Sequence, residues 1–286
     1  MPEFPFLITP AGLAARLGDD GLCVIDCRFD LGDPARGRRE FEAGHIPGAV
    51  YADLDRDLAG PVRPDTGRHP LPDPQVFAET LGRWAVGRDS DVVVYDALNG
   101  ATAARAWWLL RWMGHSRVAL LDGGFEHWQR GGHPVSAAVS VRAATTYEGR
   151  PGAAATMTTP EVADAVTTGG NLLLVDARDA ARFRGEVEPI DPVAGHVPGA
   201  RSFPLSGSLR ADGRWRDADE LRALWEPLLG TPPGRPWTVM CGSGVTACHL
   251  AVSAGLAGFQ APSLYVGSWS EWIRDPRRPV AVGDTG

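Results

Sequence analysis

Short apolar runs alternate along the chain with segments that read as helices. Residues 22–28 and 172–178 are apolar runs that predict buried strands, and residues 237–240 form a third. Helices are predicted over 101–113 and over the stretch that follows Val245. Strands that alternate with helices in this way indicate an α/β fold with a mostly parallel central sheet.

The same order of elements occurs twice. Thr9-Pro10 begins a helical segment with a threonine cap and a proline in the first turn, and Thr159-Pro160 repeats this pair 150 residues later. Other matching segments follow in the same order: 22–28 with 172–178, 44–49 with 195–200, 93–96 with 239–241, 123–128 with 267–272, and 134–135 with 279–280. We therefore predict a duplicated domain of about 130 residues. The first copy would cover 1–136, a linker 137–157 and the second copy 158–286.

Cys241 follows the third strand directly and opens a loop with glycines at positions 242 and 244. A thiol between the end of a strand and the start of a helix can be surrounded by backbone N–H groups, which stabilise negative charge. Residues 237–270 contain no Asp, Glu, Lys or Arg, so backbone N–H groups and hydroxyls must hold any anion within this loop. A single cysteine is often a core residue, but the glycine-flanked loop favours a nucleophile.

The two copies differ at this position, because Asp96 stands in the first copy where Cys241 stands in the second. The first copy is therefore predicted to be inert. Polar residues that recur in both copies are predicted to be structural, since one copy lacks the nucleophile. These residues are Asp26, Arg28 and His45 in the first copy and Asp176, Arg178 and His196 in the second.

Composition narrows the classes of function. The formal net charge of −7 disfavours a nucleic-acid surface, and the absence of lysine excludes lysine Schiff bases and the Walker phosphate loop. No apolar run is long enough to span a membrane, and the N-terminus lacks the basic start of a signal peptide. The four cysteines match no zinc pattern and are too few for a disulfide scaffold. We therefore expect no metal, no cofactor and a reducing, cytoplasmic environment.

The chain resembles the tandem-domain sulfurtransferases of the rhodanese family. The resemblance rests on the repeat, the inert first copy, the Cys241 loop and two motifs, Phe41-x-x-x-His45-Ile46-Pro47-Gly48-Ala49 and Tyr265-x-Gly267-Ser268-Trp269-Ser270-Glu271-Trp272. It implies two rhodanese-like domains, each a mostly parallel five-stranded sheet flanked by helices. It also implies that a sulfane sulfur moves from a small donor to the cysteine, as a persulfide, and then to an acceptor.

Within this family, the loop Cys-Gly-Ser-Gly-Val-Thr over 241–246 is similar to that of 3-mercaptopyruvate sulfurtransferases. Thiosulfate-preferring members usually carry basic residues at the positions held here by Gly242 and Ser243. Thiosulfate is a compact dianion and gains from positive charge beside the thiol. Mercaptopyruvate carries one carboxylate away from its sulfur, so it needs a neutral loop and an arginine at a distance.

The resemblance also implies roles for individual residues. It implies a catalytic set of Cys241, Ser243, His69 and Asp55. It implies substrate contacts from Arg182, Gly242, Gly244, Val245 and Thr246, with Arg182 pairing with the donor carboxylate. Mercaptopyruvate enzymes usually have a second arginine before the Gly-His-x-Pro-Gly-Ala turn, but residues 186–192 read Glu-Val-Glu-Pro-Ile-Asp-Pro. By sequence, this second arginine is missing.

Several alternatives stay open at this level. The chain could prefer thiosulfate, or it could be a non-catalytic sensor that binds a persulfide. The acceptor could be thioredoxin, a small thiol or cyanide. A phosphatase of similar loop geometry is disfavoured, because such an enzyme needs an arginine that closes the loop on the phosphate and residues 245–247 read Val-Thr-Ala.

Overall fold

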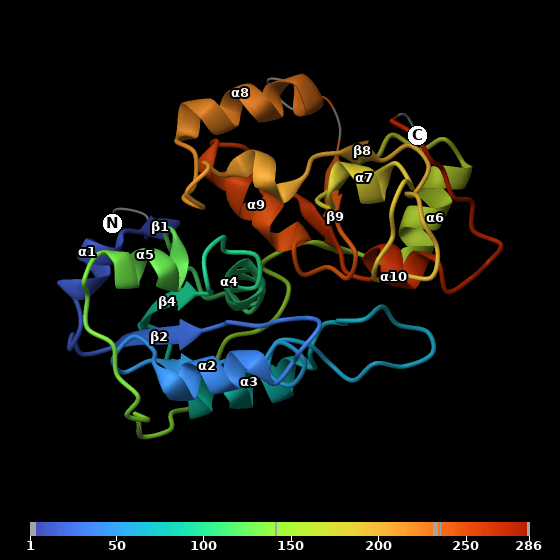
Figure 1. Ribbon diagram of the computed structural model, residues 1–286. Coiled ribbons are helices and arrows are strands. Elements are labelled where there is room, and N and C mark those ends of the chain that lie inside the picture. Colours follow the sequence, from blue (N-terminus) through green and yellow to red (C-terminus); the bar gives the residue numbers. More distant parts are fainter. Residues whose placement is uncertain (1–3, 141, 231–233, 235, 285–286) are drawn as a thin grey trace. The chain divides into compact units, whose positions relative to one another are not determined.

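Figure 1 shows the computed structural model, which describes residues 4–140, 142–230, 234 and 236–284. The chain forms two compact units. The first contains the residues up to Gly60 together with 72–154 and 211–215, and the second contains 61–71, 155–210 and the residues from Arg216 onward. A short segment from each half of the sequence therefore belongs to the unit of the other half.

The first unit is built on a parallel sheet with the strand order β1-β5-β4-β2-β3. Its strands are β1 (Leu7–Ile8), β2 (Leu22–Asp26), β3 (Val50–Tyr51), β4 (Asp91–Tyr95) and β5 (Val118–Leu121). Its helices are α1 (Pro10–Ala14), α2 (Arg36–Ala43), α3 (Pro74–Arg83), α4 (Ala103–Trp112) and α5 (Gly124–Arg130). Strand β2, which pairs with β4 and β3, is buried at every residue, as expected of a strand covered by helices on both faces.

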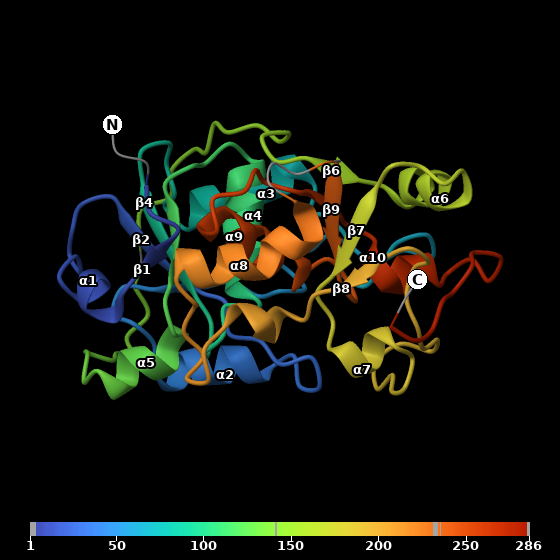
Figure 2. The ribbon, with the colours of Figure 1, turned by 90° about the horizontal axis from the view of Figure 1, so that it is seen from above.

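The second unit repeats this design, with the order β6-β10-β9-β7-β8. Its strands are β6 (Thr156–Met157), β7 (Leu173–Asp176), β8 (Arg201–Ser202), β9 (Trp237–Met240) and β10 (Ser263–Tyr265). Its helices are α6 (Thr159–Thr167), α7 (Ala180–Phe183), α8 (Ala218–Leu229), α9 (Ala247–Leu256) and α10 (Ser268–Trp272), with a 3-10 turn at Leu205–Ser208. Figure 2 shows α8 beside α9 and α6 near α10. The predicted fold class, two five-stranded α/β domains, is confirmed.

Strands β2 and β7 are shorter than predicted because each ends at an aspartate that binds an arginine two residues later. Arg28 donates from Nη2 to Asp26 Oδ2 over 2.6 Å, and Arg178 donates in the same way to Asp176 over 2.7 Å. Each arginine also donates to the carbonyl of the glycine that opens the Gly-His-x-Pro-Gly-Ala turn. These buried pairs therefore fix the end of the strand to that turn, which confirms the structural role predicted for them.

The histidines of the two turns also have structural contacts. Nδ1 of His45 is hydrogen-bonded to the carbonyl of Phe41 over 2.7 Å, and Nδ1 of His196 to the carbonyl of Phe183 over 2.8 Å. Each imidazole stacks on the ring of the same phenylalanine. The predicted bracing role of both histidines is confirmed.

The start of α6 differs from the prediction by one residue. Thr158, and not Thr159, is the N-cap, because Thr158 and Glu161 form a capping box in which the Thr158 N–H donates to Glu161 over 2.7 Å. The hydroxyl of Thr159 is instead buried in a 2.8 Å hydrogen bond with the Tyr265 hydroxyl. In the first unit, Thr9 caps α1 as predicted.

The segment 137–157, predicted as a linker, is anchored by specific contacts. Tyr147 is buried and donates its hydroxyl to the carbonyl of Met113 over 3.2 Å, and Arg142 donates to the carbonyl of Leu22 over 2.6 Å. The last two residues of the segment form β6, an edge strand of the second sheet. Within the described part of the chain, no helix is long and apolar enough to cross a membrane.

Candidate active site

The loop over 241–246 connects β9 to α9 at the carboxyl edge of the second sheet. All four residues of β9 are buried, so the strand is held rigidly in the sheet and presents Cys241 at its end. Thr246 is the N-cap of α9, which begins at Ala247. Ligands of parallel α/β sheets bind at the carboxyl ends of the strands, so this loop lies where a site is expected.

The sulfur of Cys241 accepts a backbone hydrogen bond inside its own loop. The N–H of Gly244 lies 3.1 Å from Sγ, and the side chain of Cys241 is buried. Gly244 has a φ of +78°, a conformation that favours glycine and that turns its N–H back toward the sulfur. Cys248, on the first turn of α9, donates its thiol to the carbonyl of Gly244 over 3.3 Å and so supports the turn from below.

The start of α10 holds the loop from the other side. The N–H of Cys241 donates to Ser268 Oγ over 3.1 Å, and the N–H groups of Trp269 and Ser270 donate to the carbonyls of Cys241 and Gly242 over 2.9 and 2.8 Å. Ser268 adopts a φ of +52°, which is unusual for a residue other than glycine. The loop is therefore fixed by backbone contacts before any ligand is bound.

Ser243 is paired with His69, a residue from the first half of the sequence. Nδ1 of His69 lies 2.8 Å from Ser243 Oγ, and both side chains are buried. The segment 61–71 that carries His69 belongs to the second unit, where the N–H of Gly67 donates to Glu271 and the N–H of Arg68 to Ser270, both over 3.0 Å. Two of the predicted catalytic side chains, Ser243 and His69, are thus in direct contact.

Two guanidinium groups flank the loop at Gly242. A β-carbon at Gly242 would lie 3.1 Å from Nη2 of Arg68 and 3.8 Å from Nη2 of Arg182. Arg182 comes from α7 and was predicted for this site, whereas Arg68 was not. The one available signal for Arg68 was its position directly before His69, because a residue next to a predicted catalytic side chain is carried to the same part of the fold.

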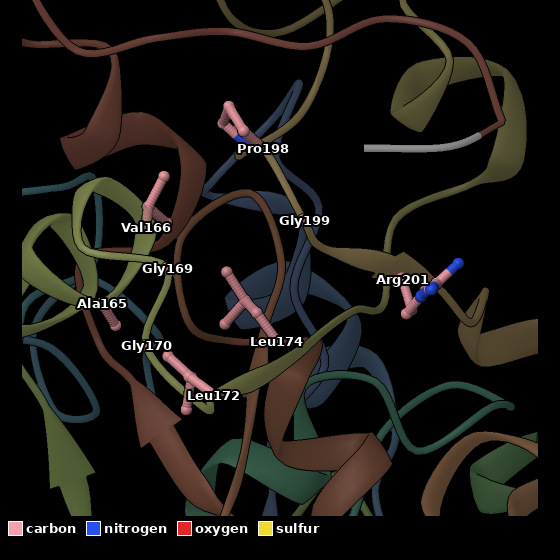
Figure 3. Close-up of a pocket in the computed structure, with 9 residues that line it drawn as sticks. All are labelled: Ala165, Val166, Gly169, Gly170, Leu172, Leu174, Pro198, Gly199 and Arg201. Carbon is pink, nitrogen blue, oxygen red and sulfur yellow. The ribbon is translucent and has the colours of Figure 1, made fainter.

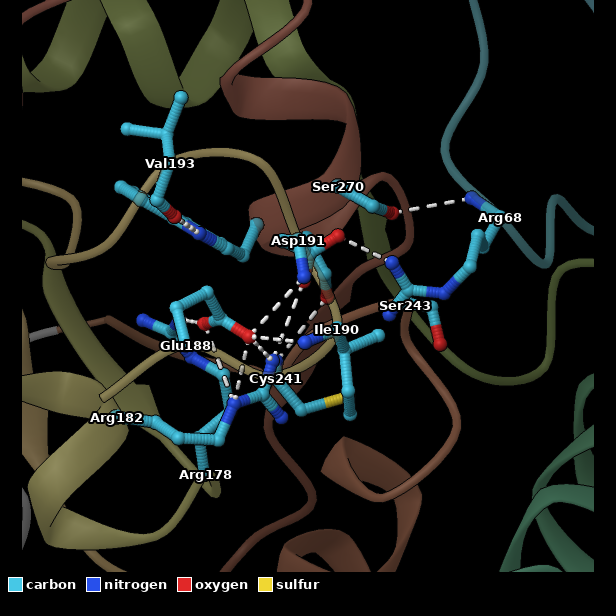
Figure 4. Close-up of polar contacts among 12 residues, drawn as sticks. Arg68, Arg178, Arg182, Glu188, Ile190, Asp191, Val193, Cys241, Ser243 and Ser270 are labelled. Carbon is cyan, nitrogen blue, oxygen red and sulfur yellow. Dashed lines mark hydrogen bonds and ion pairs between the residues drawn. The ribbon is translucent and has the colours of Figure 1, made fainter. Parts of the chain in front are cut away.

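Both arginines are held by buried carboxylates (Figure 4). Arg182 donates from Nη2 to Glu188 over 2.7 Å and to Asp191 over 3.2 Å, and Arg68 donates from Nη1 to Asp191. Burial opposes the negative charge of Glu188, but the Arg182 guanidinium and two backbone N–H groups lower its pKa below the usual value. The ion pairs therefore fix both guanidinium groups beside the loop.

A family model described as the rhodanese-like domain matches residues 9–131 and 158–275. The chain belongs to the rhodanese family. It is 49% identical over 280 residues to the probable 3-mercaptopyruvate sulfurtransferase of Pseudomonas aeruginosa, covering 97% of this chain and 98% of that protein. It is 37% identical to the putative thiosulfate sulfurtransferase SseB of Mycobacterium tuberculosis, covering 97% of each.

Solved structures agree with this assignment. The 3-mercaptopyruvate sulfurtransferase from Leishmania major has a TM-score of 0.84 and 28% identity, covering 96% of this chain and 76% of that one. The predicted family is confirmed, and this rhodanese is a sulfurtransferase.

Asp55 lies in the first unit of the rhodanese chain, on an exposed turn after β3. Its N–H donates to Asp53 Oδ1 over 3.0 Å. Partial burial and the charge of Asp53 raise the pKa of Asp55 above its usual value. Cys241, Ser243, His69 and Arg182 all belong to the second unit, so the catalytic role of Asp55 stays a prediction.

Asp96 fills the loop of the first rhodanese domain with its own carboxylate. Four backbone N–H groups donate to it, from Gly100 over 2.9 Å, Thr102 over 3.0 Å, and Leu98 and Ala103 over 3.2 Å each. Burial raises the pKa of Asp96, although these N–H groups oppose the shift. The loop that surrounds a thiol in the second domain is thus occupied by a fixed anion in the first, as an inert copy would require.

Arg178 is close enough to the Cys241 sulfur for the two groups to interact electrostatically. Burial disfavours its charged form, yet the pKa of Arg178 is raised because Asp176, Glu188 and the Cys241 sulfur all favour the cation. Its guanidinium also lies over the Trp269 ring, 4.8 Å from the centroid. Its positive charge is therefore held close to the loop by a buried ion pair with Asp176.

The second domain has a separate pocket of 310 Å³, and none of its described lining residues is a cysteine, serine, histidine or carboxylate (Figure 3). It is lined by Leu172, just before β7, and by Gly199, just before β8, so it lies at the amino ends of the strands. Among the described residues that line it, Arg201 alone carries a charge. Over the residues that the structure describes, there is also no cluster of three or more His, Cys, Asp or Glu side chains that could hold a metal ion.

Gly244→Ala is expected to lower kcat/KM by about 10²-fold, the usual cost of losing one preorganised N–H donor. The new β-carbon would lie 2.6 Å from the carbonyl oxygen of Val266, so the turn would have to move its N–H away from Cys241. Gly199→Ala is the matched control, since Gly199 has a φ of +80° but no atom within 4 Å of such a β-carbon. Equal activity losses in the two variants, measured by steady-state kinetics, would contradict a specific role for the Gly244 N–H.

Proposed function

We propose that this rhodanese transfers sulfur from 3-mercaptopyruvate, through a persulfide on Cys241, to a thiophilic acceptor. The observation that carries the proposal is the arrangement around the sulfur. A backbone N–H contacts Sγ, the loop itself carries no charged side chain, and two arginines lie to one side at Gly242. This arrangement suits a donor whose single negative charge lies away from its reacting sulfur.

In the first half-reaction, the Cys241 thiolate attacks the sulfur of mercaptopyruvate. A sulfur–sulfur bond forms and the carbon–sulfur bond breaks, with its electron pair leaving on the enolate of pyruvate. The proton of the donor thiol moves to that enolate, so the products are pyruvate and the Cys241 persulfide anion. Thiolate attack is the step that a converging N–H donor supports, because negative charge passes through this position.

Ser243 and His69 are proposed to guide this proton. Their 2.8 Å hydrogen bond links a hydroxyl in the loop to an imidazole that can accept or release a proton near neutral pH. The resemblance to the family also implies a catalytic role for Asp55, which stays a prediction. The loop residues Gly242, Gly244, Val245 and Thr246 are proposed to surround the donor, and Arg182 to bind its carboxylate, assisted by Arg68.

In the second half-reaction, an acceptor attacks the terminal sulfur of the persulfide and the Cys241 thiolate is released. Thioredoxin, a small thiol or cyanide has the nucleophile that this step requires. All four cysteines are free in the structure, which supports the proposal of a reducing compartment such as the cytoplasm.

The donor assignment makes a direct kinetic prediction. We expect kcat/KM to be higher for mercaptopyruvate than for thiosulfate when both are measured with the same acceptor. The reason is that Gly242 and Ser243 add no positive charge for a second anionic group. Relatives named for each of the two donors are similar to this chain, so the comparison must be made on this protein. A value for thiosulfate that equals or exceeds that for mercaptopyruvate would refute the assignment.

A further inference from the structure

Two buried acidic residues, Glu188 and Asp191, bind the arginines beside the loop (Figure 4). Their side chains are 4% and 3% exposed. Burying a carboxylate is costly unless it is paired and hydrogen-bonded. Both carboxylates are paired, and their partners include Arg68 and Arg182 at Gly242. Their placement therefore bears on how the site binds an anion.

Glu188 holds Arg182 in one orientation. Its Oε1 atom accepts from Nη2 of Arg182 over 2.7 Å and from Nε over 3.1 Å, so two hydrogen bonds hold one edge of the guanidinium. The same oxygen accepts the N–H groups of Ile190 and Asp191, each over 3.1 Å. These backbone contacts fix the carboxylate, and the carboxylate in turn fixes the arginine.

Asp191 connects the two arginines. It accepts from Nη2 of Arg182 over 3.2 Å and also from Nη1 of Arg68, although Arg68 is 123 residues away in the sequence. One carboxylate therefore sets the spacing of the two guanidinium groups beside Gly242.

The charges around the loop nearly cancel. Arg178 is matched by Asp176, and Arg182 and Arg68 are matched by Glu188 and Asp191. An anion that enters would thus find oriented N–H donors but little excess positive charge. Because charge interactions in a partly buried site are weakly screened, each further negative charge on the ligand would meet the two carboxylates as well as the arginines.

We propose that Glu188 and Asp191 are specificity-determining residues for the sulfur donor. They hold Arg182 and Arg68 at the loop and keep the site close to neutral, so that a monocarboxylate donor is accepted and a compact dianion is disfavoured. Both are positioning residues, since they hold the arginines and set the charge of the site. The inference rests on the proposed function in one respect, that the donor reacts at Cys241.

Asp191→Asn tests this inference because it keeps the shape of the side chain and removes one negative charge. The variant is expected to raise kcat/KM for thiosulfate about tenfold, mainly through a lower KM, as one weakly screened charge is removed. For mercaptopyruvate the change should stay within about threefold, because its single charge keeps the same two arginines. The ratio of the two donors is the readout, since loss of folded protein lowers both values equally.

Glu186→Gln is the matched control. Glu186 lies two residues before Glu188, but its side chain is 53% exposed and pairs with Arg184 on the surface. This variant changes the net charge by the same amount and should leave the donor ratio unchanged. Sulfate gives a second measurement, because as a dianionic inhibitor it should bind about tenfold more tightly to Asp191→Asn, and no more tightly to Glu186→Gln.

The melting temperature of each variant shows whether it is folded. If Asp191→Asn folds poorly, Glu188→Gln serves as the second test variant. It too should shift the ratio toward thiosulfate. An unchanged ratio in the folded variants, or an equal shift in Glu186→Gln, would overturn the inference. The wild-type protein and the variants together separate the two proposals. If donor-treated wild-type protein carries no persulfide on Cys241, the proposed function fails. If the persulfide forms but the variants leave the donor ratio unchanged, this inference alone fails.

Discussion

Cys241→Ser is expected to abolish sulfur transfer from every donor. A hydroxyl cannot form the persulfide, and losing the nucleophile of an enzyme typically costs about 10⁴-fold or more in kcat. The N–H of Gly244 that contacts Sγ cannot compensate, because it stabilises charge but does not accept sulfur. Steady-state kinetics measures the loss. Mass spectrometry of donor-treated wild-type protein should show one added sulfur atom on the peptide that carries Cys241.

Asp96→Ala is the matched control, since Asp96 occupies the equivalent position in the first domain, which is predicted to be inert. Most of the sulfur transfer should remain, measured below the melting temperature of the variant. The melting temperature itself should fall, because four backbone N–H groups lose their acceptor and each unsatisfied group costs about 1–3 kcal/mol. Stable sulfur on Cys23, Cys27 or Cys248 in place of Cys241 would contradict the assignment of the nucleophile.

Removing the arginines beside Gly242 is expected to have the next largest effect. Arg182→Ala should lower kcat/KM for mercaptopyruvate roughly 10- to 100-fold, because a hydrogen bond to a charged group contributes about 1.5–3 kcal/mol. Arg68→Ala should cost a similar factor if both guanidinium groups bind the donor carboxylate. The double variant should lose more than either single variant, with less than additive effects because Asp191 contacts both arginines.

Arg184→Ala is the control for these variants. Arg184 follows α7 two residues after Arg182, but its ion pair with Glu186 lies on the surface. Its removal should leave kcat/KM unchanged. Unchanged kinetics in Arg182→Ala would remove that residue from the site, and an equal loss in Arg184→Ala would assign the effect to general charge.

Much of the fold was predictable because local sequence patterns determine its helices and strands. The apolar run of β9, the cysteine and two glycines that follow it, and the start of α9 lie within a few residues of one another, so short-range preferences determine them. The duplication, and the difference between the two copies at the loop, were predictable for a similar reason. They require only that two stretches of sequence be compared, as at Asp96 and Cys241.

The precise ends of elements were less predictable. The strand predicted over 172–178 stops at Asp176, since the ion pair with Arg178 ends the strand there. The N-cap of α6 is Thr158 and not the predicted Thr159, because Glu161 completes a capping box with Thr158. In both cases a specific side-chain contact decided between neighbouring positions that have similar propensities.

The sequence by itself determined that this protein is a duplicated α/β chain with a thiol on a neutral loop in its second half. The tertiary structure decided what surrounds that thiol. His69 and Arg68 sit in an irregular segment without hydrophobic periodicity, so no local pattern reports that they join the second unit. The stretch 186–192 lacks an arginine, yet its Asp191 binds Arg68 across 123 residues of sequence. Ion pairs of this kind depend on distance in space, which only the folded chain defines.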